Sequence, residues 1–270
     1  MDAPLSLGFD HLVVSVPSLS EAIEHARNAG FTVHPGGRHS ELPTENALIA
    51  FADGGYLELL APRTRMSRVA ARRLVRGPEW QYWRRRVDAV GRRFLPHLGR
   101  LGVCDLVLRG AELSSFAARA RAHGVFADGP IAMGRERPDG RVLAWELLMP
   151  DSFNLPFLIE DITPREWRVP SEPAAVTHAN GATGVASVTM RVRNLTGAAE
   201  RWNAWCDAPP PDAEASTMSL AVAGLQIVLE LGTPPADHSA SWLGTSRATL
   251  AGVHHRATLA AIAHWGITGG

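Results

Sequence analysis

A histidine and a glutamate interrupt two otherwise apolar, strand-like segments of this 270-residue chain. His11 lies in residues 9–16, FDHLVVSV, and Glu58 lies in residues 56–62, YLELLAP. Successive side chains of a strand point to opposite faces, so His11 lies on the more polar face of its strand and Glu58 shares a face with Tyr56. A carboxylate in an apolar strand needs a cation, a metal ion or a hydrogen-bond donor. Because an imidazole and a carboxylate can transfer protons or hold a metal ion, this pair is the first candidate for a site.

The strand that carries His11 begins a unit that recurs along the chain. Residues 105–125 overlay residues 11–31 without gaps, which places Asp105 on His11. A third copy begins near Ser187, and an incomplete fourth copy spans residues 247–268. Each copy has the period of a strand and then of an amphipathic helix, and turn-separated apolar runs follow the first three helices. The sequence therefore predicts tandem βαβββ units and an α+β fold.

The repeats predict three regions. Residues 1–168 contain the first two units, separated by an arginine-rich helical insert at residues 63–99. Residues 169–183, rich in proline, alanine and small polar residues, are expected to form a linker. Residues 184–270 contain the third unit and the incomplete fourth one. The insert could roof a cleft, and a solvated helical crossover is the alternative.

Composition excludes several classes of function. The formal charge is zero, which argues against a nucleic-acid partner. The chain contains no lysine, which rules out Schiff-base chemistry and Walker-type phosphate loops, and we expect no nucleotide cofactor. No apolar run reaches the roughly 20 residues of a membrane span and no signal peptide is recognisable, so we expect a cytoplasmic protein without a membrane partner. Cys104 and Cys206 lie among apolar neighbours and are expected to be inert.

Several segments resemble a known family: FDHLVVSV at residues 9–16, PGGRH at 35–39, YLELLAP at 56–62, LPFLIEDITPREWRVP at 155–170 and HANGATG at 178–184. Together with the paired βαβββ units they resemble the vicinal oxygen chelate superfamily, in particular its glyoxalase-like group. The resemblance implies a cupped mixed sheet from each pair of units, with a site lined by polar positions of the first and last strands. Such units host isomerases, lyases, ring-cleaving oxygenases and binding proteins, so the fold does not fix the reaction.

The resemblance also implies a divalent metal ion held by the first and last strands of each unit. Carried over residue by residue, the ligands would be His11, Glu58, Asp105 and Glu160. This oxygen-rich set favours magnesium or manganese, with zinc as a further candidate, over iron, which prefers two histidines and a carboxylate. Alternatives remain open: Asp105 could pair with an arginine, Glu160 could be a surface carboxylate, and another alignment places Phe157 opposite Glu58.

Further residues are candidates for substrate contact at the expected mouth of the cup, namely Arg38, His39, Asn46, Tyr56 and Arg109. In similar proteins the loop at residues 36–46 lies at this mouth, and Arg109 could hold an acidic group of the substrate. His39 would reach a metal ion only if its loop folded inward. The alternatives are an ordinary polar loop and ion pairs between Arg109 and nearby acids.

The leading hypothesis is a small-molecule enzyme of the glyoxalase-like type, with lyase or isomerase chemistry on a substrate with vicinal oxygens. A ring-cleaving dioxygenase is less favoured. Glu58 and Glu160 are the candidate bases, and the metal ion would polarise a carbonyl group or an enediolate. The alternative is a metal-free protein of the bleomycin-resistance type that sequesters an aromatic molecule, with stacking surfaces from Trp80, Trp83, Trp145 and Tyr56. A homodimer is compatible with either function.

Overall fold

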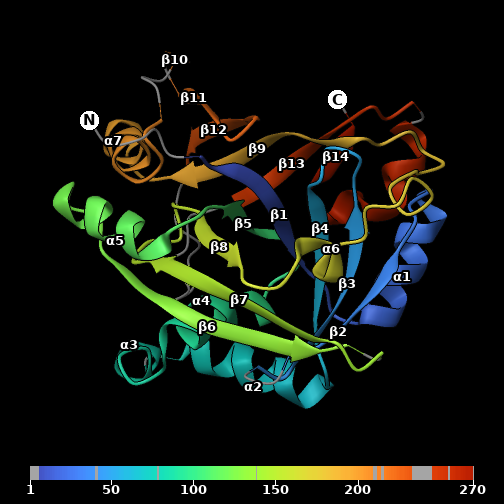
Figure 1. Ribbon diagram of the computed structural model, residues 1–270, viewed down its shortest axis with the longest axis horizontal. Helices are drawn as coiled ribbons and strands as arrows, with labels where there is room; N and C mark the ends of the chain where they lie inside the picture. Colours follow the sequence, from blue (N-terminus) through green and yellow to red (C-terminus); the bar gives the residue numbers. More distant parts are fainter. Residues whose placement is uncertain are drawn as a thin grey trace.

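Two mixed β-sheets packed against helices make up the computed structural model (Figure 1). The structure describes residues 6–39, 42–77, 79–137, 139–208, 212–213, 216–232, 245–254 and 256–269. The first sheet has the strand order β2-β3-β4-β1-β5-β8-β7-β6, and the second has the order β10-β11-β12-β9-β13-β14. The predicted α+β fold of tandem βαβββ units in cupped mixed sheets is confirmed.

The first sheet is built from two units and the helical insert between them. The first unit contains β1 (Gly8–Ser15), α1 (Leu19–Asn28), β2 (His34–Arg38), β3 (Thr44–Ala50) and β4 (Tyr56–Pro62). The insert contains α2 (Arg65–Arg76), α3 (Trp80–Trp83) and α4 (Ala89–Leu98). The second unit contains β5 (Gly102–Arg109), α5 (Leu113–Ala122), β6 (Ala127–Glu136), β7 (Val142–Pro150) and β8 (Phe157–Asp161), and the short helix α6 (Arg165–Arg168) follows.

The second sheet contains the later copies of the repeat. Its elements are β9 (Gly184–Val192), α7 (Leu195–Cys206), β10 (Asp212–Ala213), β11 (Thr217–Val222), β12 (Leu225–Leu231), β13 (Thr245–Ala251), the 3-10 helix η1 (Arg256–Trp265) and β14 (Ile267–Gly269). Part of the predicted third and fourth units, including residues 233–244, lies outside the described ranges. Within those ranges, no helix has both the length and the apolar character that crossing a membrane requires.

The ungapped repeat has a direct structural counterpart. β5 starts at Gly102 and α5 at Leu113, each 94 residues after Gly8 and Leu19, where β1 and α1 start. β1 and β5 pair antiparallel, so the two units of the first sheet meet along their first strands. Equivalent residues of the two units therefore lie close together at the centre of the sheet.

The first strand of each copy carries an extra residue at the same place. The register of the β1–β5 pair shifts between Phe9 and His11 and again between Val13 and Val14, and the β9–β13 pair shifts at the equivalent points. The extra residues are Asp10, Cys104, Ala186 and Ser246. Because a bulge locally breaks the strict alternation of side chains, it can re-aim a side chain toward a site. In β1 the bulge brings the side chain of Asp10 to that of His11.

Helix α4 of the insert packs against the concave face of the first sheet. The side chain of Asp88 caps the helix by accepting a hydrogen bond from the backbone N–H of Gly91. Val90 and Phe94 then pack into an apolar cluster with Trp145 of β7 and other residues of the sheet. In Figure 1 helix α2 of the insert lies at the lower edge of the view, and α4 lies close to β6 and β7. The insert thus fills part of the cup, and Val90 and Phe94 become part of its lining.

The predicted linker at residues 169–183 lies against the first unit. Nε2 of His178 is 3.0 Å from the carbonyl oxygen of Ala50, and its Nδ1 accepts a hydrogen bond from the backbone N–H of Thr32. Nδ2 of Asn180 donates to the carbonyl oxygen of Ala29 at 2.7 Å. Hydrogen bonds therefore tie this segment to the edge of the first unit on its way to the second sheet.

Candidate functional site

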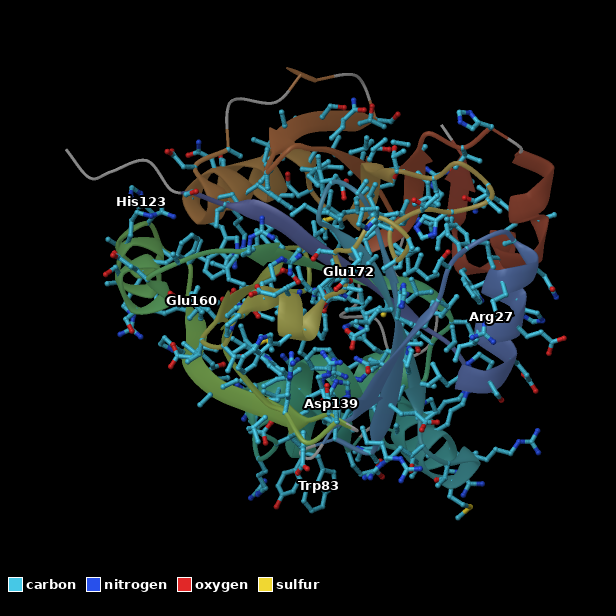
Figure 2. All side chains as sticks on the ribbon, turned by 45° about the vertical axis from the view of Figure 1, so that its right-hand side comes forward. Arg27, Trp83, His123, Asp139, Glu160 and Glu172 are labelled. Atoms are coloured by element: carbon cyan, nitrogen blue, oxygen red, sulfur yellow. The ribbon has the colours of Figure 1, made fainter. Side chains whose placement is uncertain are left out.

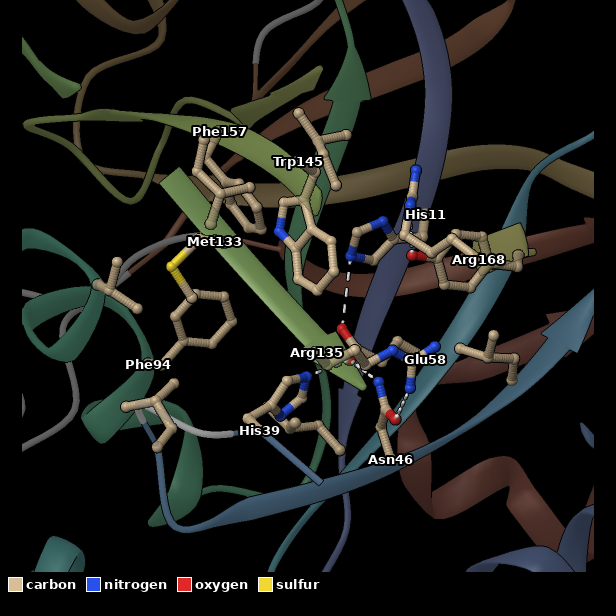
Figure 3. Close-up of a pocket in the computed structure, with 17 residues that line it drawn as sticks. His11, His39, Asn46, Glu58, Phe94, Met133, Arg135, Trp145, Phe157 and Arg168 are labelled. Atoms are coloured by element: carbon tan, nitrogen blue, oxygen red, sulfur yellow. Dashed lines mark hydrogen bonds and ion pairs between the residues drawn. The ribbon is translucent and has the colours of Figure 1, made fainter. Parts of the chain in front are cut away.

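A pocket opens on the concave face of the first sheet, where strands of both units face one another (Figure 3). It encloses about 660 Å³, its open mouth included. Its polar side chains are His11, His39, Asn46, Tyr56, Glu58, Arg135 and Arg168. Its apolar side chains are Leu42, Leu48, Leu60, Val90, Phe94, Met133, Trp145, Leu147, Phe157 and Ile159. Apolar walls with a few convergent polar groups are the usual form of a small-molecule site.

His11 belongs to a buried chain of charges that ends at Arg168. Nδ1 of His11 lies 2.7 Å from Oδ1 of Asp10. Arg168 on α6 donates to both carboxylate oxygens of Asp10 at 3.1 Å and to both oxygens of Asp161 at 2.6 and 2.7 Å. Burial alone would raise the pKa of Asp10, but Arg168 and the hydrogen bond with His11 hold it well below its usual value. Asp10 is therefore a fixed anion that orients the imidazole of His11.

The other ring nitrogen of His11 faces Glu58 on the neighbouring strand. Nε2 of His11 lies 3.4 Å from Oε2 of Glu58. Burial would lower the pKa of His11, but the hydrogen bonds with Asp10 and Glu58 raise it above its ordinary value of 6.5. The ring of Tyr56 stacks on the imidazole, with centroids 4.5 Å apart and an interplanar angle of 19°. The imidazole is thus held between two carboxylates and against an aromatic face.

Glu58 is surrounded by donors from the first unit. Nδ2 of Asn46 donates to Oε1 of Glu58 at 2.5 Å, and Nε2 of His39 lies 3.8 Å from the same oxygen. Burial alone would raise the pKa of Glu58, but His11, His39 and Asn46 lower it from 4.5 to about 2. Gly36 leaves room for the Asn46 amide, because a Cβ atom at Gly36 would overlap Oδ1 of Asn46. In the free protein Glu58 is therefore a stable anion.

The second unit contributes an apolar wall to the pocket. Phe157 of β8 and Trp145 of β7 face the cavity, and so does Phe94 of α4. The rings of Phe94 and Phe157 meet edge to face, with centroids 5.6 Å apart. The ring of Phe157 also meets that of His11 edge-on at 6.2 Å. The charged part of the site therefore comes mainly from the first unit and α6, while the second unit and α4 supply aromatic surface.

Both carboxylate oxygens of Asp105, which is predicted to ligate a metal ion, are bound by side chains of α4. Nε and Nη2 of Arg93 donate to its two carboxylate oxygens at 2.7 Å each, and Nε2 of His97 lies 2.8 Å from Oδ2. Burial would raise the pKa of Asp105, but Arg93 and His97 hold it well below its usual value. Both partners come from α4, which fills the cup beside β5. The alternative interpretation, an ion pair with an arginine, is the one that the structure shows.

The side chain of Glu160, the second predicted base, does not line the pocket. Phe157 and Ile159 line the cavity, and alternation along β8 turns Glu160 to the opposite face. Its two oxygens accept hydrogen bonds from the backbone N–H groups of Glu112 and Leu113, both at 3.1 Å. In Figure 2 it lies toward the side of the molecule that carries α5 and His123. Glu160 therefore satisfies backbone donors at the start of α5.

The donor set of the pocket does not fit the metal site that the resemblance implies. His11 and Glu58 are neighbours, but the two positions that should complete the set are occupied by Asp105, which is saturated by α4, and by Phe157. Among the described residues, no three or more histidine, cysteine, aspartate or glutamate side chains are arranged to hold a metal ion.

The predicted substrate contacts divide into two groups. His39, Asn46 and Tyr56 line the pocket together with His11 and Glu58. The side chain of Arg38 is 77% exposed and lies 4.0 Å from Glu45, outside the pocket. Arg109 lies beside Gly8 at the end of β5, and it does not line the pocket either. Neither arginine is placed to contact a substrate bound in this cavity.

Charged residues that the sequence did not single out complete the site: Asp10, Arg135 and Arg168. In a regular strand Asp10 would face away from His11, and no local pattern predicts the bulge that brings them together. Arg168 lies in the segment that carried the family resemblance, but it reaches the site only because α6 folds back onto β1. Nothing in the sequence distinguishes Arg135 from Arg137, which instead hydrogen-bonds the carbonyl oxygen of Trp167.

The opposed shifts of His11 and Glu58 predict a pH window in which their pairing stabilises the fold. The pKa of Glu58 falls from 4.5 to about 2, so its contribution is complete above pH 4.5 and is lost as the pH falls toward 2. The pKa of His11 is raised from 6.5, so its contribution is complete below pH 6.5 and is lost as the pH rises through the raised value. Urea unfolding should therefore show the largest loss of unfolding free energy in Glu58→Gln between about pH 4.5 and 6.5. A loss that is constant from roughly pH 3 to 9 would contradict this pairing.

Known proteins share this architecture at low sequence identity. A crystal structure of a hypothetical protein from Staphylococcus aureus superposes with a TM-score of 0.69 at 16% identity, covering 92% of each chain. A mutant of 4-hydroxymandelate synthase from Streptomyces coelicolor gives a TM-score of 0.55 at 13% identity, covering 98% of this chain and 76% of the synthase. A xylose isomerase-like TIM barrel/4-hydroxyphenylpyruvate dioxygenase fusion protein gives 0.52 at 14% identity, with 96% of this chain covering 39% of the fusion protein. These similarities show a shared fold.

Sequence comparison identifies the family. No curated protein matches this chain in sequence. The sequence profile of the glyoxalase-like domain, by contrast, matches residues 9–206, from β1 to the end of α7. This match covers both units of the first sheet and every residue of the pocket. The chain therefore belongs to the glyoxalase-like domain family of the vicinal oxygen chelate superfamily.

Proposed function

We propose that the chain is a small-molecule lyase or isomerase that moves a proton within a substrate bearing vicinal oxygens. The observation that supports this most is the contact between His11 and Glu58, whose facing atoms lie 3.4 Å apart at the polar end of the pocket. The pKa of His11 is raised and that of Glu58 is lowered. Two close titratable groups whose environments push their pKa values apart are suited to act as an acid and a base.

In this proposal His11 is the acid and Glu58 is the base. The Nε2–H group of His11 donates its proton to a carbonyl oxygen of the substrate, while the carboxylate of Glu58 takes a proton from the adjacent carbon. The product of this step is an enol, and return of the two protons to other positions gives an isomer without net oxidation or reduction. Asp10 keeps the imidazole oriented throughout, because it is bound to Nδ1.

Substrate binding would also raise the pKa of Glu58, the proposed base. In the free protein His11, His39 and Asn46 hold the pKa of Glu58 at about 2, which makes it a weak base. A substrate oxygen that accepts the Nε2–H group of His11 would separate the two partners. With that contact gone, the carboxylate regains basicity, so proton removal is favoured only after the substrate is bound.

Deuterium exchange tests the proposal. In D₂O the protein is expected to catalyse uptake of deuterium at a carbon beside a carbonyl group in at least one of a panel of hydroxy ketones and 2-oxo acids, followed by mass spectrometry against the uncatalysed rate. Treatment with a chelator should leave the rate unchanged, because the proposed proton transfer uses only His11 and Glu58. Loss of exchange on chelation, with recovery on adding a divalent ion, would contradict this mechanism.

The aromatic surface of the pocket favours a second candidate, a protein that sequesters an aromatic molecule. Trp145 and Tyr56 line the pocket, as expected for such a function, whereas Trp80 is buried outside it and the side chain of Trp83 is exposed. Sequestration predicts tight binding without turnover. Compounds that bind in the pocket, by calorimetry, but show no exchange above the uncatalysed rate would favour this candidate over an enzyme.

A further inference from the structure

Arg135 on β6 is a buried cation in the wall of the pocket. It is only 8% exposed, and its Nη1 atom donates to Oδ1 of Asn46, a neutral partner, at 3.3 Å. Within the described part of the chain, no carboxylate lies within 4.0 Å of its guanidinium nitrogens. Burial lowers its pKa, which is the sign of a charge removed from water without full compensation. A buried charge of this kind is costly to the free protein.

The other two buried arginines of the described chain are compensated. Arg93 is 3% exposed and forms a two-bond pair with Asp105. Arg168 is 6% exposed and bonds to Asp10 and Asp161. This fold therefore pairs its other interior guanidinium groups with carboxylates. Arg135 has no carboxylate partner among the described residues, and its side chain lines the cavity.

The carboxylates around the pocket already have other partners. Arg168 bonds to Asp10 and Asp161, and Arg165 also pairs with Asp10. The oxygens of Glu58 are shared by His11, His39 and Asn46. A carboxylate partner for Arg135 would therefore have to come from a ligand.

The surroundings of Arg135 leave its guanidinium free for a ligand. A guanidinium has five N–H donors, and the hydrogen bond to Asn46 uses one of them. Gly37 lies against Nη1, where a Cβ atom would come within 2.9 Å. Oδ1 of Asn46 also accepts from the backbone N–H of Gly37 at 2.8 Å, which fixes the amide against which Arg135 rests. The remaining donors suit the two oxygens of a carboxylate.

The other walls of the cavity are apolar, and they suit the apolar part of a ligand whose carboxylate binds Arg135. Met133, two residues before Arg135 on the same strand, lines the pocket together with Phe94, Trp145 and Phe157. Figure 3 shows Phe94, Met133, Trp145 and Phe157 on one side of the pocket and Arg135 beside Asn46 and Glu58 on the other. We infer that the pocket binds an aromatic monocarboxylate, with its carboxylate on Arg135 and its ring between Phe94, Trp145 and Phe157. The inference rests on the proposed function, for which it names the class of substrate.

A matched pair of probes tests the inference by calorimetry. Phenylacetate and phenylacetamide have nearly the same shape, and only the first carries a charge. The wild-type protein should bind phenylacetate more tightly than phenylacetamide, and Arg135→Met should weaken phenylacetate binding by roughly 10- to 100-fold while changing phenylacetamide binding little. Because Arg135→Met removes an uncompensated buried charge, its melting temperature without ligand should be higher than that of the wild type.

Arg38→Met is the control, since Arg38 lies nearby with an exposed side chain and should leave the affinity for both probes unchanged. Arg135→Lys keeps the charge and should recover part of the affinity for phenylacetate. Equal wild-type affinity for the two probes, binding of neither at millimolar concentration, or unchanged phenylacetate affinity in Arg135→Met would each overturn the inference. Calorimetry requires no turnover, so carboxylate recognition and proton transfer can fail separately.

Discussion

Replacing Asp105 by asparagine is expected to lower the free energy of unfolding by about 3–5 kcal/mol. Asp105 is 2% exposed and receives two hydrogen bonds from Arg93, which is 3% exposed, and one from His97, which is fully buried. The asparagine side chain is neutral, so the guanidinium of Arg93 would remain buried without a negative partner. Its remaining acceptors would be the amide oxygen of the new side chain and the carbonyl oxygens of Ser152 and Leu155. Breaking one side of such a pair leaves an uncompensated charge, which explains the large effect.

Urea unfolding measures this loss, and an exposed pair on the same helix provides the control. Arg92 lies next to Arg93, and its Nη2 atom is 2.6 Å from Oδ2 of Asp128, whose side chain is 58% exposed. Asp128→Asn should cost no more than about 1 kcal/mol, because water screens this pair. Similar losses in the two variants would show that burial does not decide the strength of the Arg93 pair. If Asp105→Asn lost less than 1 kcal/mol, the role of Asp105 in holding α4 would be wrong.

The strands and the faces of the first unit could be predicted because they follow from local patterns. His11 and Val13 face the cup, while Leu12 and Val14 face the helices, as the alternation of β1 requires. The ungapped repeat also fixed the start of β5 and α5. One local boundary differed: Arg38 and Asn46, expected in a loop, lie on the paired strands β2 and β3. That pairing directs the Asn46 amide toward Glu58.

What could not be predicted depends on contacts between distant segments. The repeat correctly places Asp105 at the position equivalent to His11. The two side chains nevertheless have different surroundings, since Asp105 pairs with Arg93 while His11 lines the pocket. Arg93 and His97 of the insert occupy the space in front of Asp105, and no repeat in the sequence encodes the insert. The family resemblance makes Glu160 the counterpart of Glu58, whereas the alternation of side chains along β8 directs Phe157 into the pocket. The alternative alignment, which placed Phe157 opposite Glu58, agrees with that arrangement.

Glu58→Gln is expected to reduce the rate of deuterium exchange by roughly 100- to 10,000-fold, the usual contribution of a positioned general base. Glutamine has the shape of glutamate and its carbonyl oxygen can still accept the Asn46 hydrogen bond, but it cannot take up a proton at neutral pH. His11 loses one of its two carboxylate partners in this variant, so its pKa should fall toward its ordinary value. The measurement is the exchange rate per folded molecule, with folding checked by circular dichroism.

Glu160→Gln is the control for Glu58→Gln, because it removes a carboxylate that lies outside the pocket. Glu160 and Glu58 are the two carboxylates that the sequence nominated as bases, yet Glu160 binds the backbone N–H groups of Glu112 and Leu113 outside the pocket. We expect Glu160→Gln to cost about 0.5–2 kcal/mol of stability through the weakened start of α5 and to leave the exchange rate within about twofold of wild type. A large loss of exchange in Glu160→Gln, or none in Glu58→Gln, would refute the assignment of the base. Because both variants remove one carboxylate and differ in its location, the comparison tests the geometry of the pocket itself.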